Sequence, residues 1–169
     1  MADIVIRTMD RSDPEPLSAA FVAVRWVKSP DLFRGYVADH DEGRRIAFVG
    51  LWRENLAGYV TVLWASDYPP FAEHHIPEVS DLNVLPEFRR RGIGSALLDH
   101  AESAAATRSP TVGIGVGLYA DYGAAQRIYV RRGYVPDGRG IMYDNRAVTP
   151  GAEIRIDDHA TLMLTRQLR

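Results

Sequence analysis

The sequence predicts an α+β fold, in which a mixed but mostly antiparallel sheet of about six to seven strands is flanked by about four helices. Three observations predict it. Two β-rich segments flank the short polar turn Arg53-Glu54-Asn55, which is typical of a hairpin. Further along, a predicted strand is followed by an apolar helix that begins at a glycine, and then by a strand rich in β-branched residues. This order indicates a parallel strand-helix-strand unit. A further helical segment and two terminal strands complete the chain.

The N-terminal segments predict one strand and two helices. Ile4–Arg7 has the composition of a short strand. Asp10–Pro14 supplies capping residues and an early proline, which favour a helix that ends near Val24. Ser29–Asp31 repeats this start signal, and apolar residues at helical spacing follow until the polar turn at 39–43.

The central segments predict three consecutive antiparallel strands. Residues 46–52 and 57–64 form the expected hairpin. A long connection that contains prolines and aromatic residues leads from it to a third strand, Glu78–Val84. We therefore expect the central strands of the sheet to follow the two N-terminal helices in the sequence.

The C-terminal segments predict a parallel unit and then a closing pair of strands. Apolar residues recur on one stripe of the helix that follows Gly92, and Thr111–Val116 is a β-branched strand. Residues 123–132 predict another helix. Two strands, at about 140–143 and 161–168, follow and are joined by a polar stretch.

Composition restricts the class of protein. The chain has 169 residues, and no Pro/Gly/Ser-rich stretch or charge block divides it, so we expect a single domain over residues 1–169. A net charge of -2 gives no basic footprint for nucleic acid. The absence of cysteine excludes thiolate chemistry, and no segment has the apolar length for export or membrane insertion. We expect a cytoplasmic protein without a metal.

The most informative segment joins the strand that ends at Val84 to a helix, through Pro86, three arginines and the sequence Gly92-Ile93-Gly94. Glycines at a helix start allow close approach of a ligand, and the first N–H groups together with the helix dipole attract anions. The segment lacks the third small residue of a dinucleotide fingerprint and the Gly-Lys-Ser/Thr of a triphosphate loop. It therefore predicts a different diphosphate site.

Two motifs resemble those of the GNAT superfamily of N-acetyltransferases. Arg89-x-x-Gly92-x-Gly94 is similar to the family's coenzyme A pyrophosphate motif. In 121–134, Ala125 stands four residues before Tyr129, and a Gly-aromatic pair closes the helix, as in the family's other signature. The family's frequent asparagine is replaced by Tyr122, which leaves one pantetheine hydrogen bond without its usual partner. The resemblance implies acetyl-CoA as co-substrate and transfer of its acetyl group to an amine.

The resemblance also implies which residues bind the co-substrate. They comprise the end of the third strand, the arginine loop, the helix start and two positions of the second motif. These residues are Leu82, Asn83, Val84, Arg89, Arg90, Arg91, Gly92, Ile93, Gly94, Ser95, Tyr122 and Ala125.

Acetyl transfer from a thioester requires a neutral amine, a stabilised oxyanion and a proton for the departing thiolate. Tyr129 is the candidate acid, because a phenol of pKa near 10 is not far from the ~8.5 of an alkyl thiol. A tyrosine on this apolar helix face is also typical of a core position; the family resemblance favours the acid. A backbone N–H of Asn83 or Val84 is the candidate oxyanion donor.

Two carboxylates compete for the role of base. Glu78 stands where some family members carry a glutamate that deprotonates the amine through water, and Asp81 is its competitor. The two lie on opposite faces of a regular strand, so a β-bulge could change which one faces the substrate. Both could instead only orient an ammonium group, and water could accept the proton.

The acceptor is predicted as a small-molecule or peptide amine, because aromatic residues lie near Glu73, Glu78 and Asp81 in segments that line the acceptor site in this superfamily. These aromatic residues are Trp26, Phe33, Tyr36, Trp64, Tyr68 and Phe71. We expect no nucleic-acid or membrane partner, and a homodimer stays open.

Two other functions compete with acetyl transfer. Gly113-x-Gly115-x-Gly117 with a following alanine offers a weak dinucleotide pattern and thus a nicotinamide-dependent oxidoreductase. A coenzyme A-binding module without turnover is a second alternative. Glu73-His74-His75 contains metal-ligand types, but a solvated loop is the better interpretation, because no second cluster supports it.

Overall fold

The computed structural model describes residues 3–168, which form two compact units. Within these residues, unit 1 comprises 3–64 and 80–104, and unit 2 comprises 65–79 and 105–168. The strand β4 (Glu78–Val84) begins in unit 2 and ends in unit 1. The prediction of one domain over the whole chain stays a prediction.

Unit 1 contains the N-terminal strands and the helix with the glycine start. Its elements are β1 (Ile4–Thr8), α1 (Pro14–Ala23), α2 (Pro30–Asp41), β2 (Arg45–Trp52), β3 (Asn55–Leu63), the end of β4, the 3-10 turn η1 (Pro86–Phe88) and α4 (Ile93–Ala106). β2 pairs with β1 and with β3, both antiparallel, which confirms the predicted hairpin. The Ser29 side chain accepts a hydrogen bond from the Leu32 amide, so it caps α2 as its position before proline predicts.

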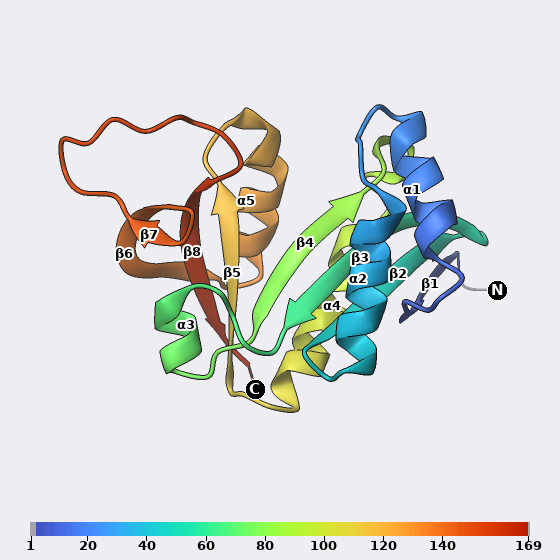
Figure 1. The fold of residues 1–169 in the computed structure, drawn as a ribbon, viewed down its shortest axis with the longest axis horizontal. Coiled ribbons are helices and arrows are strands. Elements are labelled where there is room, and N and C mark those ends of the chain that lie inside the picture. Colours follow the sequence, from blue (N-terminus) through green and yellow to red (C-terminus); the bar gives the residue numbers. More distant parts are fainter. Residues whose placement is uncertain (1–2, 169) are drawn as a thin grey trace. The chain divides into compact units, whose positions relative to one another are not determined.

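The two faces of the unit 1 strands are covered by different helices (Figure 1). On one face, α1 and α2 enclose a core that includes Phe21, Phe33 and Tyr59, all fully buried. On the other face α4 packs against β2, where a Cβ on Gly50 would touch Ile93 at 3.2 Å and Leu97 at 3.4 Å. This packing fixes the start of α4 next to the strands.

Unit 2 contains the C-terminal strands. Its elements are α3 (Pro69–Glu73), the start of β4, β5 (Thr111–Gly117), the 3-10 turn η2 (Ala120–Tyr122), α5 (Gly123–Arg131), β6 (Val135–Tyr143), β7 (Arg146–Ala147) and β8 (Ala160–Gln167). β4 pairs parallel to β5 through Glu78 with Gly113, as predicted, and β8 lies antiparallel between β5 and β6 (Figure 1). A small core contains Tyr68, Phe71 and Met163.

The hydrogen-bonded strands follow the order β1-β2-β3-β4-β5-β8-β6-β7. The predicted α+β class is confirmed, and the strand count of 8 exceeds the expected number because β7, of only two residues, was not foreseen. Helix α3 was also missed. Its two leading prolines look like a loop signal in the sequence, but they occupy the first turn of a helix, where a missing N–H costs nothing.

No helix in residues 3–168 combines the length and the apolar character that a membrane span requires.

Candidate active site

The arginine loop and the start of α4 lie in unit 1 and have the backbone of an anion site. Gly92 has φ +84°, in the left-handed region that favours glycine, and its carbonyl accepts the first helical hydrogen bond from the Ala96 amide at 3.0 Å. The amides of the following three residues therefore have no acceptor within the helix. Ile93 is buried in the core, so it can offer a ligand only its backbone.

Gly94 leaves space at this helix start. A Cβ placed on it would meet the nearest protein atom, Val84 Cγ2, at 3.7 Å, which is an ordinary contact. Packing within the protein therefore does not require glycine at this position. The missing side chain opens the first turn of α4 to a ligand, and exposed Ser95 follows it.

The three loop arginines are exposed, and two of them lie over tryptophans of unit 1. The Arg89 guanidinium lies 5.2 Å from the ring centre of Trp26, and that of Arg91 lies 5.0 Å from Trp52. Arg90 has φ +59°, unusual for a residue with a side chain, in the turn that leads to the helix. The positive charges of the three arginines suit the binding of a diphosphate. Because Arg89 and Arg91 already stack on aromatic rings, they would lose less side-chain freedom on binding it.

The second half of β4 carries a polar cluster around Asp81, which has φ +54° in the middle of the strand. Asp81 Oδ2 accepts hydrogen bonds from the hydroxyls of Tyr36 at 2.7 Å and Tyr59 at 2.6 Å. Its Oδ1 accepts from Asn83 Nδ2 at 2.7 Å and from Lys28 Nζ at 3.4 Å. A carboxylate has about four lone-pair sites, so every one of them is engaged.

The two phenols of this cluster are held in their protonated form. Burial, followed by the charge of Asp81, raises the pKa of Tyr36 and of Tyr59 well above the ordinary value for tyrosine. Both hydroxyls therefore stay donors to Asp81 at neutral pH. One of the four donors to Asp81, Lys28, is a cation.

The neighbours of Asp81 in β4 are half-buried residues, Leu82, Asn83 and Val84. A Cβ on Gly58 of β3 would collide with the carbonyl oxygen of Asn83, so glycine permits this close approach of backbone to backbone. Unit 1 thus holds Asp81, the predicted pantetheine strand and the arginine loop, for which a diphosphate site is predicted.

Glu78, the other candidate base, lies in unit 2. Its Oε2 accepts a hydrogen bond from the Ser66 hydroxyl, which in turn accepts one from the Tyr68 amide at 3.0 Å. Its Oε1 lies 3.9 Å from the place where a Cβ on Gly115 would be. This is an ordinary contact distance, so the Glu78 carboxylate does not require glycine at position 115.

Tyr129 lies on α5 in unit 2, with only 5% of its surface exposed, and its ring centre is 5.8 Å from that of Tyr134. Burial alone raises the pKa of its phenol above the ordinary value. By contrast, six other tyrosines of the described chain donate to an aspartate: Tyr36, Tyr59, Tyr68, Tyr119, Tyr122 and Tyr143. Tyr129 has no such hydrogen bond to a carboxylate among the described residues.

The other residues of the second motif also lie in unit 2. The Tyr122 hydroxyl donates to Asp158 Oδ1 at 2.8 Å, and its ring occupies the place of a Cβ on Gly117. Ala125 is half-buried on α5. Gln126, one residue later, donates to the Gly117 carbonyl at 2.8 Å and ties the helix to the end of β5.

The glycines of the alternative dinucleotide pattern lie within β5 and not in a turn between a strand and a helix. A Cβ on Gly113 would collide with the ring of Phe71, and one on Gly115 would come within 3.0 Å of the Met163 sulfur. Packing within unit 2 thus explains these glycines, and the Gly-rich turn that a dinucleotide site needs is not formed by them.

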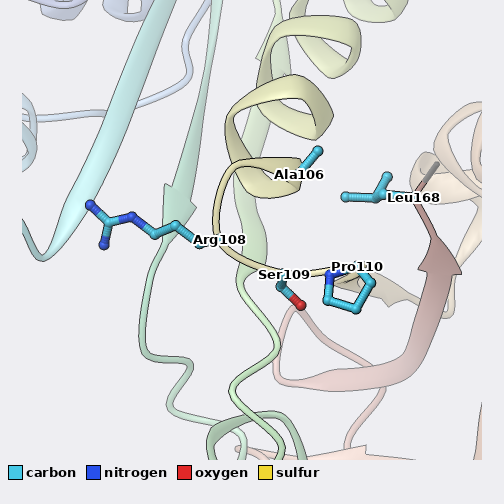
Figure 2. Close-up of a pocket in the computed structure, with 5 residues that line it drawn as sticks. All are labelled: Ala106, Arg108, Ser109, Pro110 and Leu168. Carbon is cyan, nitrogen blue, oxygen red and sulfur yellow. The ribbon is translucent and has the colours of Figure 1, made fainter.

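A cavity of about 350 Å³ lies in unit 2, at the C-terminal end of α4. Figure 2 shows the residues that line it: Ala106, Arg108, Ser109, Pro110 and Leu168. The Arg108 side chain points away from the other four. None of the predicted site residues lines this cavity, and its side chains offer no acid or base of the required kind.

No group of three or more metal-ligating side chains occurs within residues 3–168. In the segment Glu73-His74-His75, Glu73 ends α3 instead of lying in a loop, and the Nδ1 of His74 is hydrogen-bonded to the carbonyl of Pro70 in that helix at 2.8 Å.

Sequence reasoning named two partners of Asp81, Tyr36 and Asn83, as site residues and missed the other two. Lys28 and Tyr59 are separated from it by 53 and 22 residues, so no local pattern connects them. One signal was available in the sequence: Lys28 is the only lysine among the 20 lysine and arginine residues of the chain.

Comparison with solved structures shows the fold. The protein yncA of Salmonella typhimurium, solved with its cofactor acetyl-CoA, is 18% identical, with a TM-score of 0.70 over 99% of this chain and 95% of that one. The acetyltransferase of the same organism that modifies the N-terminal serine of ribosomal protein L7/L12 is 15% identical, with a TM-score of 0.73 over 100% and 97%. NAA60 of Arabidopsis thaliana in complex with acetyl-CoA is 17% identical, with a TM-score of 0.70 over 97% and 98%.

No curated protein sequence matches the chain. The acetyltransferase (GNAT) domain family, however, matches residues 31–136, which include β4, the arginine loop, α4 and α5. This match covers more than half of the 169 residues. The chain is a member of the GNAT acetyltransferase family, whose acyl donor is acetyl-CoA.

Proposed function

We propose that the protein transfers the acetyl group of acetyl-CoA to a primary amine of a small molecule or peptide, by direct attack in a ternary complex. The observation that carries the proposal is the start of α4, where left-handed Gly92 and the open position at Gly94 prepare an anion site. Structural neighbours that acetylate ribosomal proteins support an amine acceptor. A cytoplasmic location agrees with such acceptors.

Binding of the co-substrate would use unit 1. The amides that open α4, with Ser95 and the side chains of Arg89–Arg91, would neutralise the diphosphate. The backbone of Leu82–Val84 would pair with the pantetheine arm as an added strand. In unit 2, Tyr122 and Ala125 would contact the same arm. Acetyl-CoA itself supplies the activated thioester carbon.

The proposed chemistry assigns a proton to each step. Glu78 takes a proton from the acceptor's ammonium through water, so that the nitrogen can form its bond to the carbonyl carbon. A backbone N–H at Asn83 or Val84 stabilises the oxyanion. The C–S bond then breaks, and Tyr129 gives its proton to the thiolate. A phenol holds this proton at neutral pH even at its ordinary pKa. Burial raises the pKa of Tyr129 further, so the proton leaves only as negative charge develops on the thiolate beside it.

The test combines binding with turnover. Acetyl-CoA should raise the melting temperature, whereas NADH should not. Free thiol should be released from acetyl-CoA in the presence of one member of an amine panel. Gly94→Glu should abolish the shift, because its carboxylate would occupy the place of the diphosphate, while an acid in the first turn of α4 favours the helix.

Gly35→Glu is the matched control, since Gly35 lies on α2 and a Cβ added to it would have no other atom within 4 Å. It adds the same charge to the same unit and should leave the acetyl-CoA shift unchanged. Unaltered acetyl-CoA affinity in folded Gly94→Glu protein would refute the diphosphate site. Binding without thiol release for any amine would leave a coenzyme A-binding module.

A further inference from the structure

Lys28 occupies a special place in the chain. The sequence has 20 lysine and arginine residues, and Lys28 is the only lysine among them. It lies between α1 and α2, where its carbonyl accepts a hydrogen bond from the Ser18 hydroxyl at 2.6 Å. This bond holds the backbone of Lys28, so its side chain starts from a fixed point.

The Lys28 ammonium lies in a setting that suits an organic cation. Its Nζ is 5.5 Å from the ring centre of Tyr59 and 5.9 Å from that of Phe21. It is 3.4 Å from Asp81 Oδ1, and the side chains of Lys28 and Asp81 are 20% and 24% exposed. Aromatic faces and one partly shielded carboxylate are the groups that recognise ammonium ions.

Among the four donors to Asp81, Lys28 is held least tightly. The two phenols and Asn83 donate at 2.6 to 2.7 Å, against 3.4 Å for Lys28 Nζ. The two phenols occupy Oδ2 completely, and only one lone pair of Oδ1 remains for a cation. The ammonium is therefore the partner that another cation can replace most easily.

The single lone pair of Asp81 that Lys28 occupies also decides which cation fits. A guanidinium prefers two parallel acceptors, whereas an ammonium is a compact point charge that needs only one. The nearby Arg45 agrees with this distinction, because its guanidinium lies 4.5 Å from the Tyr36 ring centre but pairs with Asp39. The position beside Asp81 Oδ1 thus selects an ammonium.

We propose that Asp81, Tyr59 and Phe21 form a binding site for a primary ammonium on an unbranched alkyl stem, and that Lys28 fills this site until such a cation displaces it. The identification of this cation as the acetyl acceptor rests on the proposed function. The site itself does not, since it needs neither acetyl-CoA nor turnover. Lys28 then acts as a built-in competitor that weakens binding of the acceptor.

The single lysine makes the displacement directly measurable. Protein labelled with ¹³C at the lysine ε-carbon gives one lysine signal, shifted by the rings of Tyr59 and Phe21. Titration with n-butylammonium, without acetyl-CoA, should move this signal toward the position of an exposed lysine. The uncharged isostere 1-butanol should not. A lysine signal that ignores n-butylammonium, or that responds equally to 1-butanol, would overturn the proposal.

Three variants, titrated with the same probe by calorimetry, extend the test. Lys28→Met keeps an apolar stem and removes the competitor, so the affinity for n-butylammonium should rise roughly three- to tenfold. Arg11→Met removes one positive charge at an exposed position and should leave this affinity unchanged. Asp81→Asn should weaken binding by about tenfold or more. Equal affinities in wild type and Lys28→Met would contradict displacement.

The outcomes separate this site from the proposed function. An enzyme that acetylates amines but whose Lys28 signal does not respond would refute the site and keep the activity. A protein whose Lys28 responds but that releases no thiol with any amine would keep the site and refute the activity.

Discussion

Two sets of phenols in this protein differ in what their protons do. In unit 1, Tyr36 and Tyr59 both donate to one oxygen of Asp81. In unit 2, Tyr129 is also buried, and burial alone raises its pKa. The hydroxyls of the first pair donate hydrogen bonds to a carboxylate, whereas the Tyr129 hydroxyl does not.

The difference teaches how one residue type can serve recognition and catalysis. A phenol that is bonded to a carboxylate resists giving its proton to anything else, because ionisation would place two negative charges side by side. Such a phenol shapes a binding site. A buried phenol without an anionic partner can donate to a charge that develops beside it.

The largest test of this contrast is Tyr129→Phe. If Tyr129 donates the proton to the thiolate, turnover should fall about 10²- to 10⁴-fold while the ring keeps its packing. Tyr134→Phe deletes a neighbouring buried phenol and should keep turnover within a few-fold. The measurement is steady-state thiol release with one active acceptor. A folded Tyr129→Phe enzyme with wild-type turnover would leave thiolate protonation to solvent.

Asp81→Asn tests the role of the two phenols that donate to Asp81, Tyr36 and Tyr59. Asparagine tolerates the left-handed backbone of this position, so the change removes charge without adding strain. An amide nitrogen in the place of Oδ1 accepts no hydrogen bond, so Asn83 and Lys28 would lose this acceptor, and the free energy of unfolding should fall by about 1–3 kcal/mol. Asp41→Asn, at an exposed ion pair, should change it by less than about 0.5 kcal/mol. Equal losses in urea unfolding would contradict the cluster's role.

Glu78→Gln asks which carboxylate of β4 accepts protons. If Glu78 is the base, its loss should lower the rate about tenfold near neutral pH and move the pH-rate profile toward alkaline conditions, where solvent deprotonates the amine. Asp81→Asn is the matched control: it should raise KM for the acceptor and leave the shape of the profile. An unshifted profile for Glu78→Gln would assign the proton to water.

The smallest effect concerns alkaline stability. Because the pKa of Tyr59 is raised in the folded state, the unfolded chain loses this proton first as pH rises above about 10. The free energy of unfolding should therefore fall with rising pH in that range. Tyr59→Phe should make the fall shallower, by at most about 1.4 kcal/mol per pH unit. Parallel slopes for wild type and Tyr59→Phe would show that the cluster does not hold the phenol.

Local signals predicted the frame of the molecule well. β4 has the predicted bounds, and α4 begins after Gly92, because strand composition and a glycine turn act over a few neighbouring residues. The parallel pairing of β4 with β5 followed from the helix that separates them. The GNAT motifs depend on the same kind of local spacing, so they could be identified before the fold was known.

Features that depend on distant contacts could not be predicted. The left-handed backbone at Asp81 is stabilised by donors from α2, β3 and the loop before α2, and no residue beside it marks the irregularity. The glycines of β5 suggested a nucleotide loop, because the sequence does not reveal that Phe71 and Tyr122 fill the space beside them. The roles of Glu78, Asp81 and Tyr129 stay predictions.

The stacking of the arginine loop on tryptophans has an optical consequence. Of the three tryptophans, Trp26 and Trp52 lie beneath the guanidinium groups of Arg89 and Arg91. Indole emission responds to a neighbouring charge, so any anion that draws these arginines from the rings would change the intrinsic fluorescence. Tryptophan fluorescence would therefore report binding of an anion to the loop, and this binding can be followed in unlabelled protein in real time.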